Sequence, residues 1–162
     1  MMAKYCLEKI VSRDTKVLVL GSLPGDASLA AQQYYAHKQN HFWTIISELT
    51  TLPLVSLPYS KRIHALVNTG IGLWDIAASA VRLGSADMAI GHIKLNDLEQ
   101  VIRALPALRA VAFNGATAAK AGFGFVQCFA HIAVLNLPST SSANRMSNDL
   151  RLKRWSVIRD FL

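Results

Sequence analysis

Three short loops in this sequence place glycine or proline beside polar side chains directly after apolar runs. Residues 21–25 read GSLPG, Asn114 and Gly115 follow the run at 109–113 (RAVAF), and residues 137–144 read LPSTSSAN. Glycine lets a backbone approach a ligand closely, amide and hydroxyl groups donate and accept hydrogen bonds, and serine-rich loops can grip phosphates. These loops could therefore bind one polar ligand if the fold brings them together.

A fourth segment, residues 33–43 (QYYAHKQNHFW), is rich in aromatic and amide side chains. Aromatic rings stack on any nucleobase, and amides can both donate to and accept from a base edge. Tyr35 and Asn40 are therefore candidate binding residues. Phe42 and Trp43 instead fit the start of an apolar helix face, so we expect them in the core.

Apolar runs that alternate with helical patterns predict the elements that carry these loops. The expected strands cover 16–20, 70–73, 109–113 and 131–135, and the expected helices lie around 42–49, 63–67, 96–105, 116–121 and 147–161. Such an alternation predicts an α/β layer fold with a mainly parallel sheet. Ligands bind outside the carboxyl ends of the strands in such sheets, and the three loops fall at those ends.

Three helices carry more specific expectations. Asn96 begins a capping-box pattern and should cap the helix that follows it. The helix from residue 116 should end at Gly122, because glycine is a weak helix former. The last helix should place Leu150 in the core and Arg151 in solvent, according to its apolar spacing.

Composition predicts one soluble domain over residues 1–162. Hydrophobic residues make up 52% of the chain and charged residues 17%, and no apolar stretch approaches the roughly 20 residues that span a bilayer. The first ten residues hold no apolar signal core, which predicts a cytoplasmic location. Lysine and arginine outnumber aspartate and glutamate 17 to 10, and the net charge of +7 fits a polyanionic partner without requiring one.

Several kinds of site have no residues to form them. Cys6 and Cys128 are far apart and outside any CxxC pattern, so neither a disulfide framework nor a metal cluster is indicated. The five histidines lack an HExxH pattern, and no GxSxG, Walker or GxGxxG motif occurs. We expect no cofactor and no metal.

The polar loops resemble motifs of a known family. Residues 21–43 resemble the first motif of the uracil-DNA glycosylase superfamily, in particular the mismatch-specific uracil or thymine glycosylases and, more closely, the hypoxanthine-DNA (DNA-deoxyinosine) glycosylase branch. Residues 137–144 resemble the loop with which that superfamily grips the strand around a flipped nucleotide. Residues 70–75 (GIGLWD) with Arg82, Gly84, Ser85 and Asp87, and residues 112–115 (AFNG), resemble further segments of the same branch.

The resemblance implies a three-layer α/β/α sandwich with a mainly parallel central sheet, and an enzyme of DNA base excision repair. Such an enzyme flips a deaminated base, here hypoxanthine, out of DNA and hydrolyses its N-glycosidic bond, leaving an abasic site. The resemblance also implies that the protein binds DNA, needs no cofactor and acts as a monomer. No lysine stands where it could form a Schiff base, so we expect a monofunctional enzyme.

The resemblance also implies roles for individual residues. The base pocket would be lined by Gly21, Ser22, Leu23 and Pro24, with Tyr35 stacking on the base and Asn114 bonding its edge. DNA phosphates or the minor groove would be contacted by Ser139, Thr140, Ser141, Asn144 and Arg145. Asn40 would position the attacking water.

Position 23 departs from the usual family pattern. Most members carry Asp or Asn there to position water, whereas this chain carries Leu23, as the hypoxanthine branch does. Because Leu23 has no polar group, we do not expect plain uracil to be a good substrate. The resemblance to the hypoxanthine branch implies that an asparagine in the position of Asn40 takes over, and it would orient the water more than it deprotonates it.

Three other functions are also compatible with parts of the sequence. The mismatch-specific relatives suggest a glycosylase for uracil or thymine opposite guanine. A non-catalytic DNA damage-binding module would keep the pocket but lose turnover through Leu23. A phosphate-binding α/β protein unrelated to DNA is disfavoured by the aromatic and amide residues at 33–43.

Overall fold

Strand β2 (Val17–Gly21) lies at the centre of the fold because its side chains are buried on both faces. In the computed structural model, which describes residues 3–82 and 90–162, Val17 and Val19 pack into one hydrophobic cluster. Leu18 and Leu20 pack into another cluster, on the opposite face. A strand that is apolar on both faces is typical of the interior of a parallel sheet, so helices must cover both sides.

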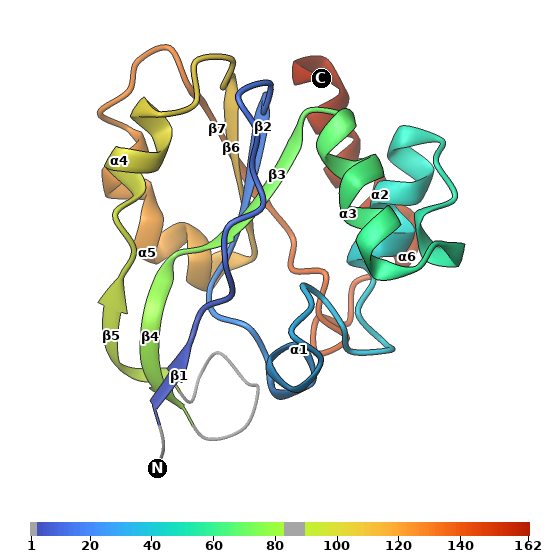
Figure 1. The fold of residues 1–162 in the computed structure, drawn as a ribbon, viewed down its shortest axis with the longest axis horizontal. Coiled ribbons are helices and arrows are strands. Elements are labelled where there is room, and N and C mark those ends of the chain that lie inside the picture. Colours follow the sequence, from blue (N-terminus) through green and yellow to red (C-terminus); the bar gives the residue numbers. More distant parts are fainter. Residues whose placement is uncertain (1–2, 83–89) are drawn as a thin grey trace.

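The central sheet has four parallel strands. Strand β2 lies between β3 (Ile71–Asp75) and β6 (Ala110–Asn114), and β7 (Ala133–Leu137) pairs with the outer side of β6. Helices cover both faces of this sheet (Figure 1), which confirms the predicted three-layer α/β/α sandwich.

Each face of the sheet has its own group of helices. One face is covered by α2 (Phe42–Thr50), α3 (Tyr59–Asn68) and α6 (Asn148–Trp155), together with the short helices η1 (Leu54–Ser56) and η3 (Ser156–Phe161). The opposite face is covered by α4 (Leu98–Arg103) and α5 (Ala116–Val126). Helix α1 (Asp26–Ala31) follows β2 at the carboxyl end of the sheet.

A second, antiparallel sheet was not predicted. Strand β4 (Ala77–Arg82) pairs with β1 (Ala3–Tyr5) on one side and β5 (Ile90–Leu95) on the other. These strands lack the continuous apolar runs of the central sheet, so their pattern is weak in the sequence. The motif residues Gly84, Ser85 and Asp87 lie outside the described residues.

The cap of α4 lies one residue later than expected. Asp97, not Asn96, accepts a hydrogen bond from the N–H of Gln100, at 2.9 Å. The Asn96 side chain donates instead to the backbone carbonyl of Asp75, at 2.8 Å. Asn96 therefore fixes the carboxyl end of β3, where the site described below begins.

Helix α5 does not end at Gly122 but continues to Val126, because this glycine allows the helix to pack closely on the sheet. A Cβ atom at Gly122 would lie 2.5 Å from both Ile76 Cδ1 and Phe113 Cε1. The expected strand at 131–135 is likewise displaced, to Ala133–Leu137.

We expect Gly122→Ala to lower the free energy of unfolding by about 1–3 kcal/mol, because the added methyl group overpacks the core. Urea unfolding measures this change. Gly124→Ala is the matched control, since no atom lies within 4 Å of a Cβ there and alanine favours the helix. A Gly122→Ala protein as stable as Gly124→Ala would contradict the packing argument.

The last helix reverses the expected burial of two neighbouring residues. Leu150 is 45% exposed, whereas Arg151 is only 1% exposed. The apolar spacing gave no sign that a guanidinium would be buried, since Arg151 is held by oxygen atoms of Ser139, Asn144 and Asn148. Trp155 and Ile158, further along the chain, are buried.

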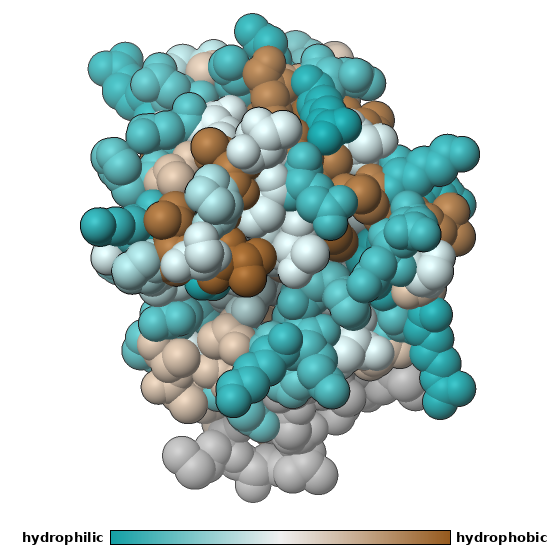
Figure 2. Space-filling model, turned by 90° about the vertical axis from the view of Figure 1, so that its right-hand side faces the viewer, coloured by the Kyte–Doolittle hydropathy of each residue, from teal (hydrophilic) through white to brown (hydrophobic). Residues whose placement is uncertain are grey.

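The outer surface of the helical layer is mainly hydrophilic. Figure 2 views the side formed by α2, α3 and α6, and hydrophobic side chains appear there in small groups among polar ones. Among residues 3–82 and 90–162, no helix is both long enough and apolar enough to span a membrane.

Candidate active site

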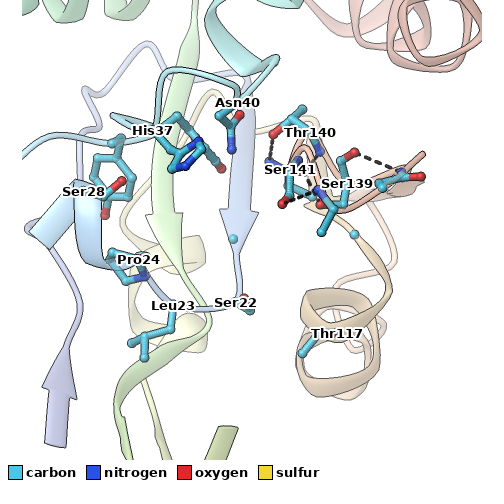
Figure 3. A pocket seen from close by; sticks show the side chains of 18 of the residues that line it. Ser22, Leu23, Pro24, Ser28, His37, Asn40, Thr117, Ser139, Thr140 and Ser141 are labelled. Atoms are coloured by element: carbon cyan, nitrogen blue, oxygen red, sulfur yellow. Dashed lines mark hydrogen bonds between the residues drawn. The ribbon is translucent and has the colours of Figure 1, made fainter. Parts of the chain in front are cut away.

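The carboxyl ends of the parallel strands open into a cavity of about 590 Å³. Figure 3 shows its walls: His37 and Asn40 lie on one side, Ser139 to Ser141 on another, and Ser22 to Pro24 on a third. The predicted residues that line it are Gly21, Ser22, Leu23, Pro24, Tyr35, Asn40, Asn114, Ser139, Thr140, Ser141 and Asn144. Arg145 is exposed and is not among the residues that line the cavity.

The end of β2 must be glycine because a carboxylate occupies the adjacent space. A Cβ atom on Gly21 would lie 2.8 Å from Asp75 Oδ1 and 3.5 Å from the Tyr35 hydroxyl oxygen. Asp75 is the residue paired with Gly21 in the β2–β3 register, and it is only 4% exposed. Gly21 therefore allows a carboxylate and a phenol to meet at one end of the cavity.

Tyr35 is held in an unusual position. Its φ angle is +55°, a left-handed conformation that is rare for a bulky residue and is often found at functional sites. Its ring stacks on Phe42, with centroids 4.0 Å apart and an interplanar angle of 22°. Phe42 and Trp43 are buried, as predicted. Tyr35 thus has one ring face covered, and only its other face and its hydroxyl remain for a ligand.

The Tyr35 hydroxyl remains protonated at neutral pH. Burial raises the pKa of this phenol, a hydrogen bond from Asn114 lowers it in part, and the charge of Asp75 raises it further. The net effect is a raised pKa, so Tyr35 can act as a hydrogen-bond donor.

Asn114 connects the end of β6 to the serine-rich loop. Its Nδ2 donates to Thr140 Oγ1 and its Oδ1 accepts from the Thr140 N–H, both at 2.9 Å. Thr140 is fully buried, so its side chain holds the loop in place and is not free for the DNA contact that we expected of it. The carbonyl of Thr140 also accepts from the His41 N–H at 2.9 Å, which ties the loop to the segment that carries Asn40.

Asn40 presents a donor to the cavity. Its Oδ1 accepts a hydrogen bond from the N–H of Phe42 at 2.9 Å, in an Asx turn that precedes α2. This bond assigns the amide orientation, and the Nδ2 group is directed toward the cavity in Figure 3. Asn40 can therefore orient a water molecule by donating to its oxygen, but its own oxygen is already engaged.

The loop at 139–144 is organised by its own hydrogen bonds. Ser139 Oγ accepts from the Ser141 N–H at 3.2 Å, Ser141 Oγ accepts from the Ala143 N–H at 3.3 Å, and Asn144 Nδ2 donates to the Ser139 carbonyl at 3.0 Å. Because each serine hydroxyl accepts one bond, its hydrogen is left to donate outward.

Arg151 of α6 stabilises this loop through its guanidinium group. Its Nε donates to the carbonyl of Ser139 at 3.1 Å, and its two terminal nitrogens donate to the carbonyl of Asn144 and to Asn148 Oδ1, each at 2.7 Å. The guanidinium group thus joins both ends of the loop to α6.

Leu23 contributes no polar group to the site. Its side chain is 6% exposed and packs with Ala77 and Ala80 of β4. The position at which most of the family carries Asp or Asn is therefore part of a small apolar cluster.

Asp75 is a site residue that was not predicted, although the sequence carries a signal for it. Asp75 follows the apolar residues of β3 directly, just as Asn114 ends β6 and Gly21 ends β2. Polar groups at the carboxyl ends of parallel strands face a ligand, so Asp75 could have been predicted for the same reason as Asn114.

Comparison with known proteins agrees with this geometry. The profile of the uracil DNA glycosylase superfamily matches residues 8–161. A hypoxanthine DNA glycosylase of Methanosarcina acetivorans is 33% identical, over 97% of this chain and 98% of its own length. One of Methanosarcina barkeri is 32% identical, over 96% of this chain and 97% of its own.

A solved structure has the same fold. It is a solution NMR structure of a candidate uracil DNA glycosylase from Methanosarcina acetivorans, with a TM-score of 0.88 and 32% identity, covering 98% of this chain and 97% of that one. Family profile, relatives and structure each extend over nearly the whole chain. This chain therefore belongs to the uracil DNA glycosylase superfamily.

Proposed function

We propose that this protein excises hypoxanthine from DNA by hydrolysing the N-glycosidic bond, and that it leaves an abasic site. Membership of the superfamily makes the chain a DNA glycosylase. The base preference rests on one observation, the combination of Asn40 in the cavity wall with an apolar Leu23, which the hypoxanthine branch shares. The names of the Methanosarcina relatives support the same substrate.

The cavity suits a flipped nucleotide. Its volume of about 590 Å³ falls within the range of roughly 300–1,000 Å³ that is usual for small-molecule sites. A base inside a duplex cannot reach such a cavity, so the enzyme must extrude it and pay a few kcal/mol of unstacking energy, least for mismatched pairs. Selection for a deaminated base therefore begins before the chemical step.

The reaction is a hydrolysis through an oxocarbenium-like state. As the bond from C1′ to the base nitrogen breaks, its electron pair passes to the base and positive charge develops on the sugar. Donors near the base, such as the Tyr35 hydroxyl, stabilise the departing base. Water held by Asn40 Nδ2 then adds to C1′. The proton that it loses passes to solvent, and the departing base takes up one proton at the nitrogen that left the sugar, so the step is balanced. This addition needs little deprotonation beforehand because the sugar is strongly electrophilic.

DNA is held at the rim of the cavity. The hydroxyls of Ser139 and Ser141 can donate to phosphate oxygens, and the exposed Arg145 adds a cation beside them. Asn144, whose amide is bonded within the loop, contributes through loop shape. The net charge of +7 favours the approach of any DNA.

The described residues that line the cavity include no lysine, which supports a monofunctional enzyme without a Schiff-base step. We propose that residues 1–162 act as one domain, as a monomer, in the cytoplasm.

Excision from a set of duplexes tests this function. Labelled duplexes that differ only in carrying hypoxanthine, uracil or thymine opposite each normal base are incubated with excess enzyme and then treated with alkali. We expect cleavage at hypoxanthine, and no strand breaks before alkali. Preferred cleavage at uracil or thymine opposite guanine would instead support a mismatch-specific enzyme, and binding without base release would support a damage-binding module.

A further inference from the structure

We propose that Asp75 determines specificity by accepting a hydrogen bond from the ring N–H that deamination creates, which tells hypoxanthine from its parent base adenine. This inference rests on the proposed function and assigns it a residue. Asp75 lines the cavity and belongs to the strand beside β2, outside the motifs that we associated with base binding.

The backbone that carries the Asp75 carboxylate is held in place at the end of β3. Its residue pairs with Gly21 in the parallel register, and its backbone carbonyl accepts from Asn96 Nδ2 at 2.8 Å. The side chain itself fills the space above Gly21, with Oδ1 2.8 Å from the position of a Cβ atom there. The backbone on both sides of the carboxylate is thus fixed, as a specificity contact requires.

The location fits a base edge better than a sugar or a phosphate. Asp75 is 4% exposed and lies at the end of the central strands, whereas Ser142 and Ala143 on the serine-rich loop are exposed at the rim. A flipped nucleotide enters with its base first and leaves its sugar and phosphates outside. A carboxylate would also repel a phosphate.

Deamination reverses the hydrogen-bonding pattern of the edge that would meet Asp75. Adenine has an unprotonated N1, which accepts, beside an amino group, which donates. Hypoxanthine has an N1–H, which donates, beside the O6 carbonyl, which accepts. An ionised carboxylate only accepts, so it attracts the N1–H and repels the lone pair of adenine N1.

The Tyr35 phenol can supply a second hydrogen bond, to the O6 carbonyl of hypoxanthine. The Tyr35 oxygen lies 3.5 Å from the same point above Gly21, so a donor stands beside the acceptor. This pair complements the adjacent N1–H and O6 of hypoxanthine. Guanine has the same lactam edge, so Asp75 discriminates against adenine and not against guanine.

The test removes each partner of the proposed hydrogen bond separately and together. Duplexes carry hypoxanthine or N1-methylhypoxanthine at one position, and single-turnover excision rates are measured with the wild-type chain, Asp75→Ala and the control Asp160→Asn. Asp160 is an exposed carboxylate at the C-terminal end, away from the cavity. Any effect of N1-methylation on base pairing is common to all three proteins and cancels when their ratios of the two rates are compared.

In the wild-type chain, methylation should lower the rate roughly 100-fold or more, because the N–H is lost and the methyl group meets the carboxylate. Asp75→Ala should excise hypoxanthine about 10- to 100-fold more slowly, as expected for a lost charged hydrogen bond, and should excise the two substrates at rates within a few-fold of each other. Asp160→Asn should keep the wild-type ratio.

The same wild-type preference in Asp75→Ala would overturn the assignment, since a residue with a merely structural role would slow both substrates alike. If Asp75→Ala does not fold, Asp75→Leu, which has a similar side-chain size but no acceptor, replaces it. A ratio unchanged in that variant also overturns the assignment, whereas a ratio at least tenfold smaller supports it. Failure of the wild-type chain to excise hypoxanthine at all would instead refute the proposed function.

Discussion

Alanine at position 40 is expected to lower the single-turnover rate of hypoxanthine excision by about 100-fold or more, the usual cost of losing a preorganised polar group in an active site. Asn40 Nδ2 is directed into the cavity, and Leu23 supplies no polar group in its place. The measurement is the rate of formation of alkali-labile sites at enzyme excess, which separates the chemical step from DNA binding.

A second substitution separates two roles for the same side chain. Asn40→Asp can keep the bond to the Phe42 N–H with one oxygen, but it offers an acceptor to the cavity in place of a donor. Because we assign a donor role to Asn40, the aspartate variant should be slow as well. An aspartate variant as fast as the wild type would show that the group must accept a proton, and our account of the water would be wrong.

Asp26→Ala is the control for Asn40. Asp26 is close to the first loop in sequence, but it is exposed, does not line the cavity, and forms an ion pair with Lys4. An exposed ion pair contributes at most about 1 kcal/mol to stability. The excision rate should therefore stay near the wild-type value, and a loss of rate confined to Asp26→Ala would contradict the assignment of Asn40.

The second large effect is expected from Arg151→Met, which should lower the free energy of unfolding by about 3 kcal/mol. The substitution keeps much of the side-chain volume but leaves the carbonyls of Ser139 and Asn144 and the amide oxygen of Asn148 without their donor. At roughly 2–4 °C per kcal/mol for a chain of this size, the melting temperature should fall by about 6–12 °C.

DNA binding should weaken in the same variant, because Arg151 holds both ends of the loop that carries Ser139 and Ser141. Lys153→Met is the matched control, since Lys153 is an exposed cation on the same helix. Arg151→Lys keeps the charge without the guanidinium fork, so it should be intermediate in stability. Equal melting temperatures for Arg151→Met and Lys153→Met would show that the buried guanidinium does not support the loop.

Much of the central fold could be predicted because its signals are local. The apolar runs of β2, β3 and β6 are buried on both faces, and each is followed by a polar or glycine residue. In a parallel sheet these positions lie at one edge, so the convergence of Gly21 and Asn114 follows from element type alone.

Other features depend on contacts between residues distant in sequence. Thr140 is buried because it meets Asn114, 26 positions away. Arg151 is buried because the loop before α6 folds back and brings the Ser139 and Asn144 carbonyls to its guanidinium, a path that the apolar spacing of the helix does not record. The antiparallel sheet was missed because the short strands β1, β4 and β5 have no strong apolar pattern. The prediction that α5 ends at Gly122 was wrong because the packing of this glycine against Ile76 and Phe113 cannot be inferred from the helix sequence.

The most direct test of the central claim is a single measurement, the yield of alkali-labile sites from a hypoxanthine-containing duplex at enzyme excess, compared with the same duplex carrying adenine. We expect near-complete conversion of the hypoxanthine duplex and none of the adenine duplex. A hypoxanthine duplex that is bound but stays intact would contradict the assignment of this cavity as a hypoxanthine-excising active site.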